Sequence, residues 1–204
     1  MYPEILNEAQ KSLLPLLKQF RREFYLVGGT AIAFHIGHRR SIDFDMFKAR
    51  PFSTKKILDK ISAGNFRYQV TRRVNWQLNL LISGVKMTFF EYPYPVEATD
   101  DFDKILRMPD LISLAAMKAF ALGRRSKWKD YVDLYFILRD YFSIDQITQK
   151  AESLFGQEFS GKLFHSQLAY HKDIDYTEEV EFMPGFEVHE KTVKTFLIDR
   201  ALEW

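Results

Sequence analysis

The spacing of apolar residues divides the chain into a mixed first half and a helical second half. Apolar positions three and four residues apart predict a helix over 3–20 that Pro15 breaks in two, and another over 53–61 with Ser53 as its cap. Short apolar or alternating runs predict strands. These strands are 24–27, 41–47, 66–73, 76–83 and 85–92. Between the first two, 30–36 reads as a short buried helix that Gly37 ends.

From Pro109 onward the pattern is helical. The expected helices are 110–122, 128–140, 144–155, 160–170 and 190–202. The intervening segment 173–190 has seven carboxylates, no Lys or Arg, and Pro184-Gly185, so we expect a loop there. The sequence therefore predicts an α+β protein with a mixed core over 1–108 and a helical lobe over 109–204, packed as one two-lobed unit.

Composition restricts the class of protein. A hydrophobic content of 47% can form a core, and no apolar run approaches the roughly 18 residues of a membrane-spanning helix. The N-terminus shows no signal-peptide pattern. The absence of cysteine excludes disulfides and thiolate chemistry; it leaves the redox compartment open but fits a cytoplasmic protein, and the lack of a long apolar run predicts no membrane partner.

The net charge of +2 hides an asymmetry. Residues 1–170 carry 25 basic and 18 acidic side chains, whereas residues 171–204 carry 4 and 9. A basic body suits a polyanionic partner, although a solvated surface produces the same imbalance. The acidic segment 173–190 is either a solvated loop or a segment that folds over the basic residues and limits polyanion access.

Two neighbouring features could carry chemistry. Tyr25 to Thr30 is a strand that enters Gly28-Gly29 and then a helix; this arrangement either makes a tight turn or brings backbone N–H groups to a phosphate. Asp43 and Asp45 lie two apart on the next strand, so both carboxylates share one face while Ile42, Phe44 and Met46 fill the core. Such a pair either is solvated or holds Mg²⁺ or Mn²⁺.

Taken together these residues resemble a known signature. Gly28-Gly29-Thr30 followed by His38-Arg39-x-Ser41-x-Asp43-x-Asp45-x-Phe47 is similar to the motif of the nucleotidyltransferase superfamily, and specifically of the AbiEii/AbiGii toxin family. The resemblance implies a nucleotidyltransferase-like sheet with flanking helices. It also implies that Gly28, Gly29, Thr30, Arg39 and Ser41 bind the nucleotide, and that Asp43 and Asp45 bind the metal.

A second match lies about seventy residues further on. Lys118, Arg125 and Lys129-Asp130-x-x-Asp133 resemble the downstream lysine and Asp-x-x-Asp motifs of the same family. The resemblance makes Lys118, Arg125 and Lys129 nucleotide-binding and Lys118, Asp130 and Asp133 catalytic. From the residues alone, the basic run 118–129 equally fits a solvated helix face, and Asp130 and Asp133 could cap their helix or pair with Lys127 and Lys129.

One position departs from the family pattern. Members of the superfamily place a third carboxylate on a later strand, where this sequence has Thr88. Glu91 is the only acid in that strand and would face the other way if the strand alternates regularly. Either Glu91 serves as the third catalytic and metal-binding carboxylate, or two aspartates suffice, or catalysis has been lost.

The resemblance implies a metal-dependent transfer of a nucleoside monophosphate from an NTP to an acceptor hydroxyl. The protein would be the toxin of a toxin–antitoxin or abortive-infection system, with an antitoxin partner and RNA, including tRNA, among its acceptors. One alternative is a degenerate member that binds nucleotide or RNA without catalysis. Another is an RNA-binding surface formed by Arg72, Arg73, Trp76 and Tyr68.

Overall fold

The computed structural model describes residues 1–203, which form two compact units. The first unit comprises Met1–Gly37 and Ser41–Asp110. The second comprises His38–Arg40 and the chain from Leu111 onward. The chain therefore leaves the first unit for three residues and then returns to it.

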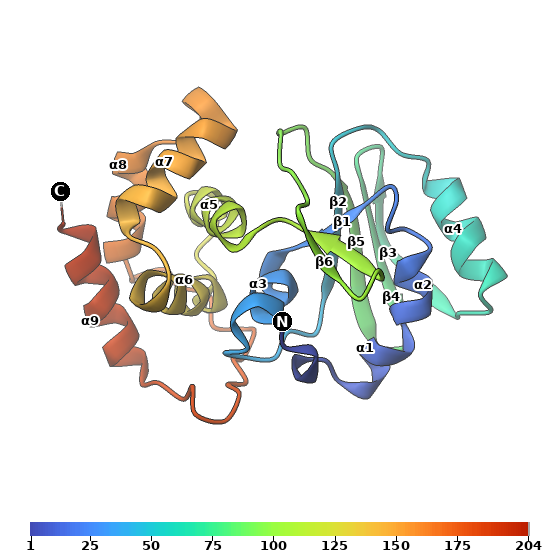
Figure 1. Ribbon diagram of the computed structural model, residues 1–204, viewed down its shortest axis with the longest axis horizontal. Helices are drawn as coiled ribbons and strands as arrows, with labels where there is room; N and C mark the ends of the chain where they lie inside the picture. Colours follow the sequence, from blue (N-terminus) through green and yellow to red (C-terminus); the bar gives the residue numbers. More distant parts are fainter. Residues whose placement is uncertain (204) are drawn as a thin grey trace. The chain divides into compact units, whose positions relative to one another are not determined.

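The first unit is built on a five-stranded mixed sheet (Figure 1). Its strands are β1 (Tyr25–Val27), β2 (Phe44–Lys48), β3 (Tyr68–Val74), β4 (Gln77–Ile82) and β5 (Val85–Glu91), in the order β1-β2-β5-β4-β3. Only β2 and β5 are parallel. The predicted turn between β4 and β5 is confirmed, since Ser83 and Gly84 both have positive φ, 52° and 80°, as a tight hairpin requires.

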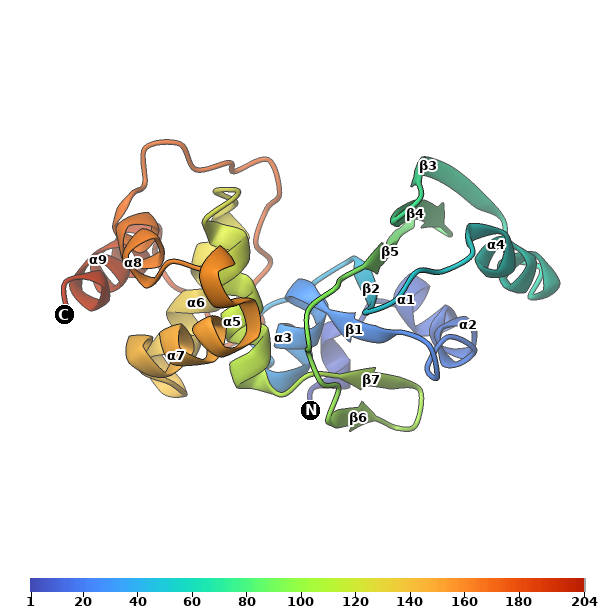
Figure 2. The same ribbon diagram turned by 90° about the horizontal axis from the view of Figure 1, so that it is seen from above.

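Helices cover one face of this sheet. The helices of this unit are η1 (Pro3–Ile5), α1 (Glu8–Ser12), α2 (Leu14–Lys18), α3 (Gly28–Ile36) and α4 (Thr54–Ala63), and α3 is not among those that cover this face. Phe20 and Phe24 pack edge-on against Phe89 of β5, with ring centroids 4.9 and 5.1 Å away. Figures 1 and 2 show α1, α2 and α4 gathered on this side. The opposite, open face carries the polar side chains discussed below.

The strand β2 is shorter than the alternation predicts. It begins at Phe44, and Ile42, which we expected in the core, is 62% exposed. Phe44 and Met46 are buried as expected. The apolar character of Ile42 misled the prediction because the residues before Phe44 are not part of the strand.

The structure also contains a hairpin that the sequence pattern does not predict. It pairs β6 (Asp100–Phe102) with β7 (Leu106–Met108). Its turn places Asp103 and Lys104 at φ 49° and 55°. Because neither residue is a glycine, the usual signal of a tight turn is missing.

The second unit is helical, as predicted. It contains α5 (Leu111–Leu122), α6 (Trp128–Asp140), α7 (Ile144–Phe155), η2 (Gly156–Glu158), α8 (Gly161–Ala169) and α9 (Glu190–Ala201). Pairs of helices pack together, α5 with α7 and α8 with α9 (Figure 2). Across residues 1–203 none of the helices combines the length and apolar character that crossing a membrane needs.

Candidate functional site

The glycine turn and the aspartate strand meet in the first unit. Gly28 starts α3 with φ +72°, and a Cβ built there would lie 2.5 Å from the Oδ2 atom of Asp45. The pairing of Val27 in β1 with Asp45 in β2 fixes this approach. No side chain caps the N-terminus of α3, so its first N–H groups are not taken up by a capping residue. The site therefore joins a carboxylate and a helix N-terminus at a position that only glycine fits.

Thr30 in α3 and Ser41 in the segment before β2, both predicted to bind nucleotide, are buried. Their hydroxyl oxygens lie 2.9 Å apart, and the Thr30 hydroxyl donates to the backbone carbonyl of Asp43. The side-chain amide of Gln10 donates to the Ser41 carbonyl at 2.7 Å. These contacts fix the backbone on either side of Ile42, and Gln10 is a contributor that the sequence analysis missed.

The open face of the sheet carries a row of polar side chains beside Asp45. Strand pairing places Thr88 of β5 next to Asp45, and Asn79 of β4 next to Thr88. Asp43 directly precedes β2. The alternation of Gln77 and Asn79 with buried leucines was the signal that could have placed Asn79 on this face.

The donor set fits a magnesium-like ion. Asp43 and Asp45 offer hard carboxylate oxygens, and Mg²⁺ is usually held by one or two carboxylates together with substrate phosphates and water. Among residues 1–203 no group of three or more histidine or carboxylate side chains is arranged to hold a metal. A resident metal cage is therefore not a feature of the described chain, whereas a site shared with a substrate phosphate suits the two aspartates.

Glu91 does not join the two aspartates. It pairs with Lys48, three positions beyond the pairing of Thr88 with Asp45, so alternation turns its side chain to the opposite face. The pairing between β2 and β5 runs without a bulge from Phe44 to Lys48. The expectation that Glu91 supplies a third carboxylate beside Asp43 and Asp45 is therefore corrected.

The downstream motif forms a buried ionic cluster within the second unit. Arg39 donates two hydrogen bonds to the Asp133 carboxylate, one from Nε at 2.7 Å and one from Nη2 at 2.8 Å. His38 Nε2 lies 2.8 Å from the same carboxylate. All three side chains are almost fully buried. Arg39 was expected to bind nucleotide, but its guanidinium instead donates hydrogen bonds to the Asp133 carboxylate and to the backbone carbonyl of Arg40.

Lys118 completes this cluster from α5. Its Nζ lies 2.7 Å from Oδ1 of Asp130 and 2.9 Å from Oδ2 of Asp133, and its side chain is 4% exposed. Arg125 adds a bond from Nε to Asp130 at 3.0 Å, and half of its side chain remains exposed. The buried cations Lys118 and Arg39 thus balance the buried anions Asp130 and Asp133, and Arg125 is the member that reaches solvent.

The charges of the cluster fix its protonation. Burial by itself raises the pKa of Asp133, but the charges of Arg39 and Lys118 and the hydrogen bonds from His38 and Arg39 hold it well below its usual value. Burial is the largest influence on His38 and lowers its pKa; Asp133 raises this pKa, Arg39 and Lys118 lower it further, and the pKa lies below its usual value. His38 is therefore neutral and donates through Nε2, while its buried Nδ1 has no hydrogen-bond partner.

The remaining cations of the basic run pair with the acidic segment. Lys127 and Lys129, which one alternative expected to pair with Asp130 and Asp133, both form ion pairs with Glu178. Burial raises the pKa of Glu178, but hydrogen bonds from both lysines outweigh burial and lower this pKa to about 2. Backbone hydrogen bonds of Asp175 with Ser126 and Trp128 tie the two segments together. The acidic segment thus covers part of the basic run, and Glu178 was not identifiable from sequence spacing.

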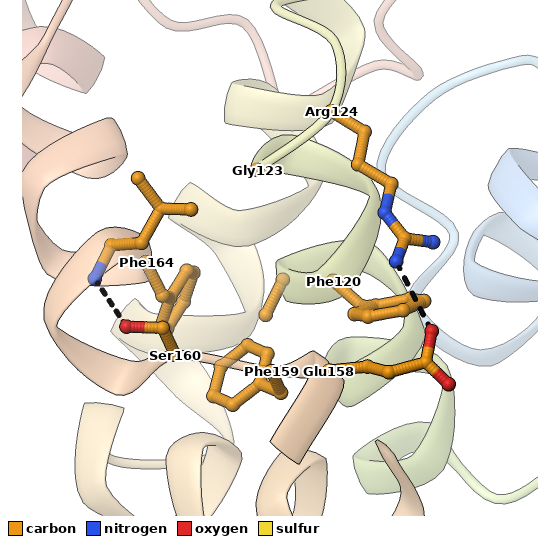
Figure 3. Close-up of a pocket in the computed structure, with 9 residues that line it drawn as sticks. Phe120, Gly123, Arg124, Glu158, Phe159, Ser160 and Phe164 are labelled. Atoms are coloured by element: carbon orange, nitrogen blue, oxygen red, sulfur yellow. Dashed lines mark hydrogen bonds and ion pairs between the residues drawn. The ribbon is translucent and has the colours of Figure 1, made fainter. Parts of the chain in front are cut away.

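A small apolar cavity in the second unit lies between α5 and α8 (Figure 3). Its volume is about 50 Å³, and Phe120 and Phe164 are among its lining residues. Arg124 sits over the Phe120 ring at 3.8 Å and pairs with Glu158 at 3.6 Å (Figure 3). The cavity is far smaller than the roughly 300 Å³ of an ordinary ligand site, so it does not hold a nucleotide.

Comparisons with known proteins give matches in both sequence and structure. The family described as "Nucleotidyl transferase AbiEii toxin, Type IV TA system" matches residues 70–199. An uncharacterized protein of Aquifex aeolicus (strain VF5) is 37% identical over 128 residues, which are 58% of this chain and 59% of the relative. The match thus spans well under two thirds of that relative's length.

Two solved structures share the fold. MenT4, the nucleotidyltransferase toxin Rv2826c of Mycobacterium tuberculosis H37Rv, superimposes with a TM-score of 0.62 at 15% identity, over 95% of this chain and 80% of that one. JHP933 from Helicobacter pylori gives a TM-score of 0.55 at 14% identity, over 96% and 91% of the two chains. The expected nucleotidyltransferase-like α+β fold is confirmed.

Proposed function

Because this chain belongs to the AbiEii nucleotidyl transferase toxin family, we propose that it transfers a nucleoside monophosphate from an NTP to an acceptor hydroxyl as the toxin of a toxin–antitoxin or abortive-infection system. The observation that carries the proposal is the approach of Asp45 to Gly28 at the N-terminus of α3. An antitoxin partner, a cytoplasmic location and a tRNA acceptor belong to the same proposal.

The N-terminus of α3 would hold the triphosphate. The N–H groups of a first helical turn and the positive end of the helix dipole favour phosphate oxygens, and Gly28 lets a ligand approach the backbone closely. Gly29 and Thr30 follow in the same turn, and the contacts of Thr30 and Ser41 keep the loop ahead of Asp43 in place. Binding here sets the α-phosphorus near Asp45.

Asp43 and Asp45 would hold Mg²⁺ or Mn²⁺. When bound, the ion neutralises charge on the phosphate oxygens and on the leaving pyrophosphate. The acceptor hydroxyl would release its proton to water, and its oxygen would form a bond to the α-phosphorus as the bond to the bridging oxygen breaks and pyrophosphate leaves. Two carboxylates serve this purpose with substrate phosphates as the other ligands, so Glu91 is not required.

The buried cluster would act on this site indirectly. Asp133 anchors Arg39, which lies four residues before Asp43 along the chain, and Lys118 and Asp130 hold Asp133 in place. We assign Lys118, Asp130 and Asp133 to positioning, because their charges satisfy one another. Arg125 is the candidate for a direct phosphate contact, since half of its side chain is exposed; Lys129 would become available only if Glu178 released it.

A second candidate function is supported by Thr88. Its place beside Asp45, where a carboxylate is expected, fits a protein that binds nucleotide without transferring it. Thermal-shift titrations with NTP separate the two functions. Stabilisation by NTP without turnover, unaffected by Asp45→Asn, supports the binding protein.

Transfer is tested directly with NTPs labelled at the α-phosphate. The purified protein is incubated with each of the four labelled NTPs, Mg²⁺ or Mn²⁺, and total RNA. Asp45→Asn and Asp43→Ala should abolish labelled product, whereas Glu91→Gln, the matched loss of a carboxylate on the opposite face, should leave it unchanged. No labelled product with any NTP and no metal-dependent NTP binding would reject the proposal.

A further inference from the structure

The meander β3–β5 has an unusual charge distribution. Between Asp59 and Glu91 the chain contains no Asp or Glu, but it contains Lys60, Arg67, Arg72, Arg73 and Lys86. Arg72, Arg73 and Lys86 are exposed. Within the described residues Arg72, Arg73 and Lys86 form no ion pair, in contrast to the basic run of the second unit.

Strand pairing places Arg72 and Lys86 on the same open face as Asp45. Asp45 pairs with Thr88, Thr88 with Asn79, and Asn79 with Arg72, so these four side chains form one row across the sheet. Lys86 is two residues before Thr88 and shares its face. Arg73 pairs with the buried Leu78, so it belongs to the opposite face.

A continuous line of aromatic rings runs beside this row. Phe47 and Phe90 lie 5.1 Å apart, and Trp76 meets Phe90 edge-on at 5.3 Å. Trp76 is 45% exposed, and the Arg72 guanidinium lies 5.8 Å from its ring centroid. Phe47 follows Asp45, and Phe90 follows Thr88, by two residues on the same face. The aromatic line thus begins next to the aspartate site and ends at Arg72.

We infer that this face, defined by Phe47, Phe90, Trp76, Arg72 and Lys86, binds a single-stranded polynucleotide that presents its hydroxyl at Asp45. The exposed ring of Trp76 and the partly exposed rings of Phe47 and Phe90 can stack with bases of any sequence, and unpaired cations attract the phosphate backbone. The unpaired cations Arg72 and Lys86 suit a polyanionic acceptor better than a protein or small-molecule acceptor. The inference rests on the proposed transfer for its acceptor role, but the binding itself can be measured separately.

Binding is measured by fluorescence anisotropy with a fluorescein-labelled single-stranded RNA of mixed sequence. Trp76→Ala should weaken binding on the order of tenfold, as loss of one stacked base does, while Trp76→Phe should retain most of it. Arg72→Ala should lower the salt dependence by about 0.7 in the slope of log K against log salt. Tyr141→Ala removes an equally exposed ring from the second unit and should have no effect.

Arg73→Ala is the matched control for charge. It removes the neighbouring cation from the opposite face, where Arg73 lines an open hollow of about 630 Å³ with Lys55. Its effect should be clearly smaller than that of Arg72→Ala. Equal effects of the two variants, unchanged binding in Trp76→Ala, or equal loss of affinity for a duplex would overturn the inference.

Asp45→Asn separates this inference from the proposed function. It should bind the RNA like the wild type and fail in transfer. RNA binding that depends on Trp76, without transfer by any variant, supports the surface and rejects the transferase. Transfer to RNA that is unaffected by Trp76→Ala and Arg72→Ala supports the transferase and rejects the surface.

Discussion

Gly28 and Asp45 approach so closely that a methyl group on Gly28 would collide with the Asp45 carboxylate, 2.5 Å from Oδ2. The contact couples the turn that begins α3 to the strand that carries the aspartate. It makes Gly28 a geometric requirement of the site and not merely a flexible residue.

Gly28→Ala should therefore destabilise the first unit by about 1–3 kcal/mol and lower NTP affinity, because it adds a clash with Asp45 to an unfavourable φ. Gly84→Ala is the control. Gly84 has φ +80° with open space around it, so this variant reports the backbone strain alone. Urea unfolding of both variants measures the difference; equal losses would mean that the Asp45 contact is unimportant.

Lys118→Met should destabilise the second unit by about 3–5 kcal/mol, because it leaves Asp130 and Asp133 buried with too little positive charge. Arg125→Met removes a half-exposed partner of Asp130 and should cost about 1 kcal/mol or less. Chemical denaturation followed by circular dichroism compares the two. A small loss in Lys118→Met would show that the cluster is not needed for folding.

Acid should weaken the contact between the acidic segment and the basic run. The pKa of Glu178 is lowered to about 2, so its contribution to stability is fully present above its unfolded value of 4.5 and is lost as the pH falls toward 2. Because the pair is partly solvated, the loss should be about 1 kcal/mol. Glu178→Gln should show a correspondingly smaller change in melting temperature between pH 6 and pH 3. An identical pH dependence in the variant would contradict this assignment.

Ile42 offers a test of the shortened strand. Since its side chain is 62% exposed, Ile42→Ser should change the free energy of unfolding by less than about 0.5 kcal/mol. Met46→Ser, at a fully buried position of β2, should unfold the first unit far more readily. Comparable losses of unfolding free energy in the two variants would show that Ile42 belongs to the core.

Local signals predict most of the helices and strands. Ser53 caps α4 by accepting from the Lys56 N–H, and Gly37 ends α3 in a left-handed conformation, as their residue types indicate. The β6–β7 hairpin escaped prediction because Asp103 and Lys104 adopt positive φ without the residue types that signal it. Alternation likewise placed Ile42 wrongly, since hydrophobicity alone does not show where a strand begins.

The proximity of some candidate site residues could be predicted from the sequence, but the partners of others could not. The proximity of Gly28 and Asp45 follows from a strand-turn-helix pattern next to a paired strand. The pairing of Arg39 with Asp133 spans 94 residues, and no periodicity links two such positions. The spacing of charges suggested that Lys127 and Lys129 pair with Asp130 and Asp133. In the structure both lysines form ion pairs with Glu178, which is distant in the sequence.

The three-residue excursion His38–Arg40 bears on any attempt to divide this chain into fragments. A fragment ending at Asp110 would keep Arg39 but lose Asp133, the carboxylate that neutralises it. The complementary fragment would keep Asp133 beside Lys118 but lose both Arg39 and His38. Neither half of the sequence is therefore a self-sufficient module, and insertion, deletion or recombination at residue 110 would separate charges that the intact chain buries together.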